Sequence, residues 1–464
     1  MNDDDNEVLH SKLNMASYGC GSLSREFVSI AFNVIVFFYY EVEIGLNVWF
    51  IAAALVIFAI YNAVNDPILG FLTNRPFKFT KKWGRRKPWI LIGGMPLGFC
   101  YFLIFIPPSI DPVADIWIIF GWLVFTTCLF DTMHSIFWVN FQSLFPDKFR
   151  SSKERRTATG IQIVLGIIGV ALGSILPPLF YQYGNLESYI IQGVVVIIYA
   201  LVTMLLAIPG LREDQEAIEI YLSSYSKQAE ESSFIKTMRN AFKQKAFIGY
   251  VFLYTMYNAS VSSMTASTPY LVYFILGMQS SAATLIMAGL LVGVLISIPI
   301  WVKLSHKLND NRKIMLIAAI LMGIYVTPLI FLESYIAIII VIIIWGTAQG
   351  AFWLMIFPVF SEVIDESVVK TGKREEGTYT GLQQFFGRLG LIIQVMSFAI
   401  IHELTGFVEG ANTQTPLAIW GIHMHLALIP MICILLGALV FWRFFDLTPE
   451  KVAEHQLAIK QMKL

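Results

Sequence analysis

The stretch DPILGFLTNRPFKFTKKWGRRKPWILIG, residues 66–93, joins two apolar segments through a strongly basic loop. An apolar run from Val48 to Ala63 precedes it, and apolar residues resume at Trp89. A helix needs about 20 mainly apolar residues to cross a bilayer, and cationic loops collect on the cytoplasmic side. The stretch therefore predicts two membrane-spanning helices with a cytoplasmic connection. The loop between them holds seven cationic residues: Arg75, Lys78, Lys81, Lys82, Arg85, Arg86 and Lys87.

The composition extends this prediction to the whole chain. Of 464 residues, 56% are hydrophobic and 14% are charged, whereas roughly a quarter of the residues in a soluble domain are charged. Further apolar runs cover 28–40 and 285–302. The chain is therefore expected to be an all-α polytopic membrane protein. Its formal net charge of zero gives no argument for a nucleic-acid partner.

Apolar runs between charged or Gly/Pro-rich breaks predict twelve transmembrane helices. We expect them near 22–41, 46–73, 88–107, 115–145, 157–181, 188–209, 246–276, 281–304, 314–332, 334–360, 379–404 and 417–445. A cytoplasmic amino terminus puts the basic segments 75–87, 146–156, 211–245, 305–313 and 361–378 inside, and the opposite loops then carry no Lys or Arg. Both termini are accordingly expected in the cytoplasm.

A weak internal repeat divides the chain into halves. FWVNFQSLFPD from Phe137 is similar to FWLMIFPVFSE from Phe352, and TATGIQ from Thr157 is similar to TYTGLQ from Thr378. We expect a six-helix bundle over 1–210, a cytoplasmic linker with short amphipathic helices over 211–245, and a second six-helix bundle with a tail over 246–464. Parallel halves around a central cavity are the architecture of major facilitator transporters.

The predicted second helix carries a candidate cation site. Asn62, Asn65 and Asp66 occupy positions i, i+3 and i+4 and share one helical face. A carboxylate inside a bilayer costs at least about 2.5 to 3.5 kcal/mol, so its presence suggests a function. The oxygens on this face can bind a hard cation. A carboxylate in apolar surroundings also has a raised proton affinity, so it can bind and release a proton. The structural alternative is that Asp66 only pairs with the basic loop.

The predicted fourth helix carries a second stripe of polar residues. Asp131, Ser135, Trp138 and Gln142 fall at i, i+4, i+7 and i+11. An indole beside hydrogen-bonding groups suits an organic ligand with one apolar face, such as a sugar or an amphiphile. The alternative is that these side chains join neighbouring helices.

Other charged residues complete the candidate sites. Arg388 is a cation inside the predicted eleventh helix, on one face with Gln384, and is expected to answer a carboxylate of the protein or the substrate. Arg25 and Glu26, near the predicted start of the first helix, are either an interfacial charge pair or a binding pair. A cytoplasmic gate is expected from four charged residues: Arg85, Arg86, Asp365 and Arg374.

Residues 66–93, together with TGKREEG at 371–377, resemble the glycoside-pentoside-hexuronide:cation symporters, the melibiose-permease-like family of the major facilitator superfamily. The resemblance implies alternating access driven by sodium or protons. It places Asp66 at the second of two cation-binding aspartates and Asn62 at the first, so that one acid of the pair is missing. It also implies that Ser135 assists the cation, that Glu26 and Trp138 stand at sugar-binding positions, and that Arg388 replaces a lysine that organises the site.

CLFDTM, residues 128–133, resembles the sodium-dependent lysophosphatidylcholine symporters around Asp131. The expected function is therefore cation-coupled import of a sugar or glycoside, with a lysolipid or other amphiphile as the alternative substrate. An intramembrane enzyme using Asp131 and His134 is a remote third reading, because the chain lacks GxSxG and HExxH motifs. We expect a monomer in the cell membrane, in contact with lipid, with no cofactor and no metal beyond a coupling Na⁺ (or H⁺) at Asp66.

Overall fold

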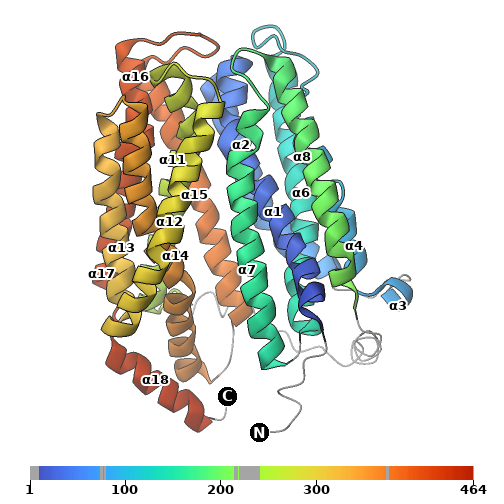
Figure 1. Ribbon diagram of the computed structural model, residues 1–464, viewed down its shortest axis with the longest axis vertical. Coiled ribbons are helices and arrows are strands. Elements are labelled where there is room, and N and C mark those ends of the chain that lie inside the picture. Colours follow the sequence, from blue (N-terminus) through green and yellow to red (C-terminus); the bar gives the residue numbers. More distant parts are fainter. Residues whose placement is uncertain are drawn as a thin grey trace. The chain divides into compact units, whose positions relative to one another are not determined.

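The computed structural model describes residues 10–73, 77, 80–149, 151–213, 218, 241–372 and 376–462. The regular secondary structure of these residues is helical, apart from one isolated β-bridge between Gln182 and Asn185. The chain divides into two compact units, and Figure 1 shows the long helices of each unit running side by side. Unit 1 comprises Met1–Ala229 with Gln279–Thr284 and Glu409–Ala411, and unit 2 comprises the remainder.

Unit 1 contains eight described α-helices. They are α1 (Lys12–Phe38), α2 (Val48–Thr73), α3 (Thr80–Trp83), α4 (Lys87–Gly94), α5 (Leu97–Leu103), α6 (Ile116–Lys148), α7 (Ser152–Ile175) and α8 (Leu186–Ala207). The first helix continues through one π-helical turn, Tyr39–Glu43. In this unit α1 packs against α7 and α8, while α6 packs against α2 and α4. These two sets of contacts position the polar side chains described below.

Glycine allows α1 and α7 to approach closely. A Cβ atom added at Gly173 would lie 2.5 Å from the backbone oxygen of Phe27, and one at Gly169 would lie 2.5 Å from that of Leu23. Small residues at helix contacts let backbones come together in a bilayer, where packing rather than the hydrophobic effect drives association. Both contacts flank Arg25 and Glu26, so they fix that part of α1 against α7.

Unit 2 also contains eight described α-helices. They are α11 (Lys245–Tyr270), α12 (Ser281–Leu308), α13 (Asn311–Val326), α14 (Tyr335–Thr371), α15 (Glu376–Thr405), α16 (Pro416–His423), α17 (Ile429–Phe444) and α18 (Pro449–Met462). The first four residues of α12 belong to unit 1. A π-helical turn, Met424–Leu428, joins α16 to α17. Here α11 packs against α15 and α17, and α13 packs against α14.

Ten helical segments of the described chain are long and apolar enough to cross a membrane. Two more segments lie where the remaining two of the twelve helices were expected. The first is the pair α4 and α5, which is interrupted at Met95–Pro96 and therefore contains no single helix of sufficient length. The second is α11, which is long enough but rich in Ser, Thr, Tyr and Asn. Such polar residues lower its mean hydropathy, yet they can be satisfied inside a helical bundle.

Several helix boundaries differ from the prediction. The first helix begins ten residues early, at Lys12, because the Ser11 hydroxyl accepts the Asn14 backbone N–H at 3.2 Å and caps it. The helix α14 continues to Thr371, where the prediction ended it near 360, and Gly372 ends it with φ 67°. The polar helix α18 was not predicted at all. Hydropathy reports where lipid can surround a helix, whereas capping and helix-forming charged residues decide where it ends.

The predicted linker, 211–245, lies mostly outside the described residues, so its expected amphipathic helices and the bundle boundaries remain predictions.

Candidate functional site

Asp66 and Ser135 are joined across α2 and α6. The Ser135 hydroxyl donates to one carboxylate oxygen of Asp66. Ser135 is buried and Asp66 is half-buried. Both residues were predicted to form the cation site, and the structure brings them together although they stand 69 positions apart.

Asp131 is the most enclosed acid of this region, with 2% of its surface exposed. The side-chain amides of Asn62 and Asn65 each donate to a different oxygen of its carboxylate, and the second contact is 3.1 Å long. A buried carboxylate needs hydrogen-bond donors because water is excluded. The amides predicted to accompany Asp66 therefore point to Asp131, an acid predicted to bind substrate.

The α2 face and the α6 stripe consequently form one polar cluster, which we call the α2–α6 acid cluster: Asn62, Asn65, Asp66, Asp131 and Ser135. Its two acids stand one helical turn apart on facing helices, since Asp131 and Ser135 are i and i+4 on α6. The cluster offers carboxylate, hydroxyl and amide groups in the same part of unit 1. Such oxygens can serve a hard cation, and either acid can accept a proton.

A second group surrounds Arg25 on α1. Its guanidinium forms an ion pair with Glu26, donates from Nε to His134 Nε2 at 3.2 Å, and lies 4.2 Å from the centroid of the Trp138 ring. The side chains of Arg25 and Glu26 are each 25% exposed. We call Arg25, Glu26, His134 and Trp138 the Arg25 cluster. The Trp138 ring predicted as a platform for substrate thus has a cation over one face.

His134 was absent from the predicted binding residues, and Arg25 was expected only as one half of an interfacial or binding pair with Glu26. The signal that locates Arg25 is the serine cap at Ser11. Because α1 begins at Lys12, Arg25 lies about 20 Å along the helix at 1.5 Å per residue. The predicted helix start near residue 22 placed Arg25 at the membrane boundary instead.

Gln142, the last residue of the predicted α6 stripe, is exposed. On α15 in unit 2, Gln384 is exposed and Arg388 is half-buried one turn further along. The neighbouring Gln383 is buried and donates to the Tyr250 hydroxyl at 2.5 Å. These α15 residues belong to unit 2, whereas the two clusters above belong to unit 1.

The internal repeat places two tryptophans at equivalent positions, Trp138 in unit 1 and Trp353 in unit 2. Each contacts the first long helix of its own unit. Trp138 lies against Arg25 of α1, and the Trp353 indole N–H donates to the Tyr257 hydroxyl of α11. Tyr257 also accepts from Gln349 at 3.4 Å. The Tyr257 group was not predicted.

Among the predicted gate residues, Arg86 is buried and donates to Asn140 of α6 at 3.1 Å. The backbone N–H groups of Arg85, Arg86 and Lys87 all donate to the carboxylate of Glu213, at 2.9, 2.7 and 2.9 Å. A carboxylate at a helix start satisfies the open N–H groups and interacts well with the helix dipole. Glu213 therefore caps α4, a role that the sequence did not indicate.

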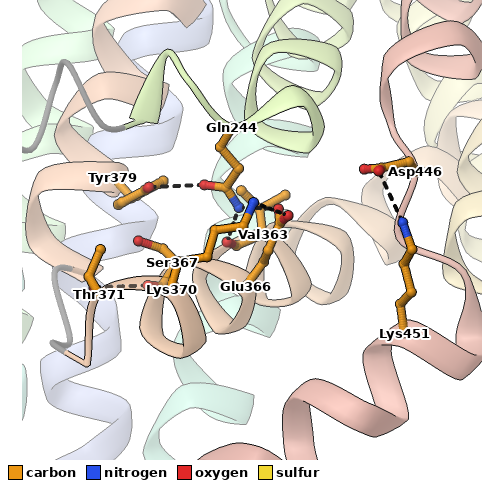
Figure 2. A network of polar contacts seen from close by, with 9 residues as sticks. All are labelled: Gln244, Val363, Glu366, Ser367, Lys370, Thr371, Tyr379, Asp446 and Lys451. Atoms are coloured by element: carbon orange, nitrogen blue, oxygen red, sulfur yellow. Dashed lines mark hydrogen bonds and ion pairs between the residues drawn. The ribbon is translucent and has the colours of Figure 1, made fainter.

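Another predicted gate residue, Asp365, adjoins a polar network in unit 2 (Figure 2). Gln244, the residue before α11, donates to the carbonyl of Val363 at 2.7 Å and to Glu366, and accepts from the Tyr379 hydroxyl at 2.9 Å. Glu366 also pairs with Lys370. The network thus joins α11, α14 and α15. Asp365 is half-buried beside Glu366 on α14, and Arg374 lies outside the described residues.

Two further observations bear on ligands. Within the described ranges, no group of three or more His, Cys, Asp and Glu side chains is placed to hold a metal ion. A pocket of about 180 Å³ in unit 2 is lined by the α12–α13 turn, Glu362 of α14 and residues of α18. It includes none of the predicted site residues.

Comparison with known families gives an independent indication. The family described as MFS/sugar transport protein matches residues 17–448. An uncharacterized symporter of Synechocystis sp. is 22% identical, over 95% of both chains. The sodium-dependent lysophosphatidylcholine symporter 1-A of Danio rerio is 22% identical over 83% of this chain and 76% of its own. The lactose permease of Lactobacillus delbrueckii subsp. bulgaricus is 24% identical over 84% and 62%.

Solved transporters have a similar fold. The nucleoside transporter NupG aligns with a TM-score of 0.60 over 94% of this chain and all of its own, at 12% identity. The xylose transporter XylE of E. coli, in an inward-open conformation, aligns with a TM-score of 0.57 over 95% and 98%, also at 12% identity. This likeness concerns the fold alone, and it confirms the expected major facilitator architecture.

Proposed function

Because the chain belongs to the MFS/sugar transport protein family, we propose that it is a cation-coupled symporter that imports a sugar or glycoside by alternating access. Asp66 is the coupling carboxylate in this proposal. The driving ion is Na⁺ or H⁺, and the protein works in the cell membrane with both termini in the cytoplasm. Its transporter class follows from the family.

The observation that carries the proposal is the α2–α6 acid cluster. Asp131 already receives two amide donors, whereas Ser135 donates to Asp66. A cation entering beside Asp66 would find a carboxylate and, after rotation of the hydroxyl hydrogen, a Ser135 oxygen lone pair. Hard cations prefer such oxygens. The insertion cost of about 2.5 to 3.5 kcal/mol for a membrane acid supports a role beyond helix packing.

The Arg25 cluster supports the substrate part of the proposal. Trp138 offers an aromatic ring, and Glu26 offers a carboxylate acceptor for hydroxyl groups, at 25% exposure. Small polar molecules are bound by a few such groups in an otherwise apolar site. For Arg388 and Gln384 of unit 2, the substrate-binding role remains a prediction from the sequence. One of the relatives is named a lactose permease.

A lysolipid or other amphiphile is the second candidate substrate. Arg25 favours it, because a guanidinium binds a phosphate group through paired hydrogen bonds. The relatives named as sodium-dependent lysophosphatidylcholine symporters agree with this choice. The two candidates are separated by measuring, in parallel, how a panel of glycosides and a panel of lysolipids compete with uptake.

Uptake into proteoliposomes tests the coupling. Na⁺ and pH gradients are imposed separately, and accumulation of the substrate found in the competition screen is followed. We expect Asp66→Asn to abolish gradient-driven accumulation and to retain exchange of internal for external substrate. Asp446→Asn is the matched control, because Asp446 is exposed and pairs with Lys451 at 3.0 Å far along the chain on unit 2. Unchanged accumulation by Asp66→Asn would refute the assignment.

A further inference from the structure

The Tyr257 group of unit 2 consists of Tyr257 on α11 and of Gln349 and Trp353 on α14. The indole N–H of Trp353 and the amide N–H of Gln349 both donate to the Tyr257 hydroxyl, the second at 3.4 Å. A hydroxyl has two acceptor lone pairs and one proton. Both lone pairs of Tyr257 are therefore used, and its proton is left to donate to another partner.

Gln349 is the second member of the group with an unmet hydrogen bond. Its side chain is buried, with 1% of the residue exposed, and its carbonyl oxygen has no hydrogen-bond partner within the described part of the chain. A buried acceptor without a donor costs free energy, so native proteins rarely keep one without a reason. Exchanging the two ends of the amide does not remove the mismatch, because Tyr257 would then donate to the oxygen and the NH₂ group would need an acceptor.

Packing fixes the positions of Tyr257 and Gln349. The Tyr257 ring stacks on Phe352, with the ring centroids 4.2 Å apart. Beside Gln349, a Cβ atom added at Gly350 would lie 2.6 Å from the Ser297 hydroxyl oxygen of α12, so α14 and α12 approach closely there. The two unmet groups are adjacent, because the carbonyl belongs to the same amide whose nitrogen lies 3.4 Å from the Tyr257 oxygen. Groups that are held in place before a ligand arrives bind it more strongly.

The unmet groups define the chemistry of a ligand. A single ligand group placed here must accept a proton from Tyr257 and donate one to Gln349. A hydroxyl does both, whereas an ionised phosphate or carboxylate only accepts and an ammonium only donates. Trp353 is half-buried, as is Tyr254 one turn before Tyr257 on α11, so the group borders on accessible surface of unit 2.

We propose that Tyr257 and Gln349 form a subsite of unit 2 that binds one neutral hydroxyl group of the transported molecule, and that Trp353 orients the Tyr257 hydroxyl. The inference rests on the proposed function, since it names residues that bind the substrate. A sugar hydroxyl and the glycerol hydroxyl of a lysolipid share this chemistry, and the experiment separates these two sources.

Thermal unfolding of the ligand-free protein in detergent micelles tests whether the Gln349 amide is unsatisfied, and it needs no substrate. Gln349→Leu removes the polar atoms and keeps a similar side-chain size, so the unfolding temperature should not fall and should rise by up to about 2 °C. The matched control is Gln383→Leu, because Gln383 is also buried and its amide donates to the Tyr250 hydroxyl at 2.5 Å. Its unfolding temperature should fall. A fall in Gln349→Leu as well would show that the amide is already satisfied, and would overturn the proposal.

Equilibrium binding identifies the hydroxyl. The probes are p-nitrophenyl-α-D-galactopyranoside and methyl-α-D-glucopyranoside, each with its monodeoxy analogues, and lysophosphatidylcholine with an analogue that lacks the glycerol hydroxyl. For a probe that binds, one analogue should bind the wild type and Gln383→Leu about tenfold more weakly than its parent, as expected for the loss of one hydrogen bond. Gln349→Leu should bind parent and analogue equally. Equal discrimination by the wild type and Gln349→Leu for every analogue would overturn the proposal.

The outcomes keep the subsite and the proposed function apart. If the wild type binds a glycoside or a lysolipid without the dependence on Gln349, only the subsite is refuted. If neither class of probe binds the wild type, the proposed substrate classes are wrong, and the hydroxyl assignment is refuted with them.

Discussion

Replacing Asn65 with alanine removes one of the two amide donors that hold the Asp131 carboxylate in the α2–α6 acid cluster. The contact is 3.1 Å long, and Asp131 is 2% exposed, so water cannot replace the lost donor freely. Hydrogen bonds to charged groups contribute about 1.5 to 3 kcal/mol. Bonds between membrane helices average about 0.6 kcal/mol and reach about 1.7. The two ranges overlap at about 1.5 kcal/mol. We therefore expect Asn65→Ala to lower the free energy of unfolding by this amount.

A double-mutant cycle with Asp131→Asn isolates the contact. In that background the partner of Asn65 is neutral, and a neutral hydrogen bond contributes only about 0.5 to 1.5 kcal/mol. If Asn65→Ala costs about 0.5 kcal/mol in the Asp131→Asn background, against about 1.5 kcal/mol in the wild type, the coupling free energy is about 1 kcal/mol. It is measured from the unfolding free energies of the four proteins in mixed lipid–detergent micelles.

The control is Asn258→Ala on α11, where the amide donates to the neutral Tyr254 carbonyl of its own helix at 2.7 Å. Its effect should add to that of Asp131→Asn within about 0.5 kcal/mol, as expected for independent sites. If the effect of Asn65→Ala were equally additive, the Asn65 amide would not interact with the charge of Asp131. The conclusion that the α2 face and the α6 stripe form one cluster would then be wrong.

Two further predictions concern the framework of unit 1. Gly173→Ala should destabilise the protein by about 1 to 3 kcal/mol in thermal unfolding, because its Cβ would meet the Phe27 backbone oxygen at 2.5 Å. Gly160→Ala on the same helix has nothing within 4 Å and should be neutral or slightly stabilising, so equal effects would refute the close approach of α1 and α7. Glu213→Gln should increase hydrogen exchange at the start of α4, since it weakens the anionic cap. The exposed Glu187→Gln is its control, and unchanged exchange in Glu213→Gln would contradict the cap.

The face of each helix followed from the sequence because helical periodicity is local. Asn62, Asn65 and Asp66 were expected on one face of α2, and Asp131 with Ser135 on one face of α6. The structure turns these two faces toward each other. Which amide would meet which acid could not be predicted, since that choice depends on the relative height and rotation of two helices about 69 residues apart.

The Arg25 cluster was partly hidden for a different reason. Hydropathy placed the start of the first helix near residue 22, whereas the Ser11 cap starts it at Lys12. The first helical turns after Ser11 are polar, so a search for apolar runs does not distinguish them from a loop. A search for serine caps before apolar segments would have placed Arg25 inside the helix, although not its contact with His134.

The sequence by itself determined that the chain is a helical protein with many membrane-spanning segments, because the thickness and apolarity of a bilayer require long apolar runs in every crossing helix. Only the tertiary structure decided the pairing of side chains. It directs Asn62 and Asn65 to Asp131, Ser135 to Asp66, and Arg25 to His134. The physical reason is that apolar periodicity is a property of one helix, whereas hydrogen bonds between helices depend on close packing, which glycine contacts such as Gly173 against Phe27 set.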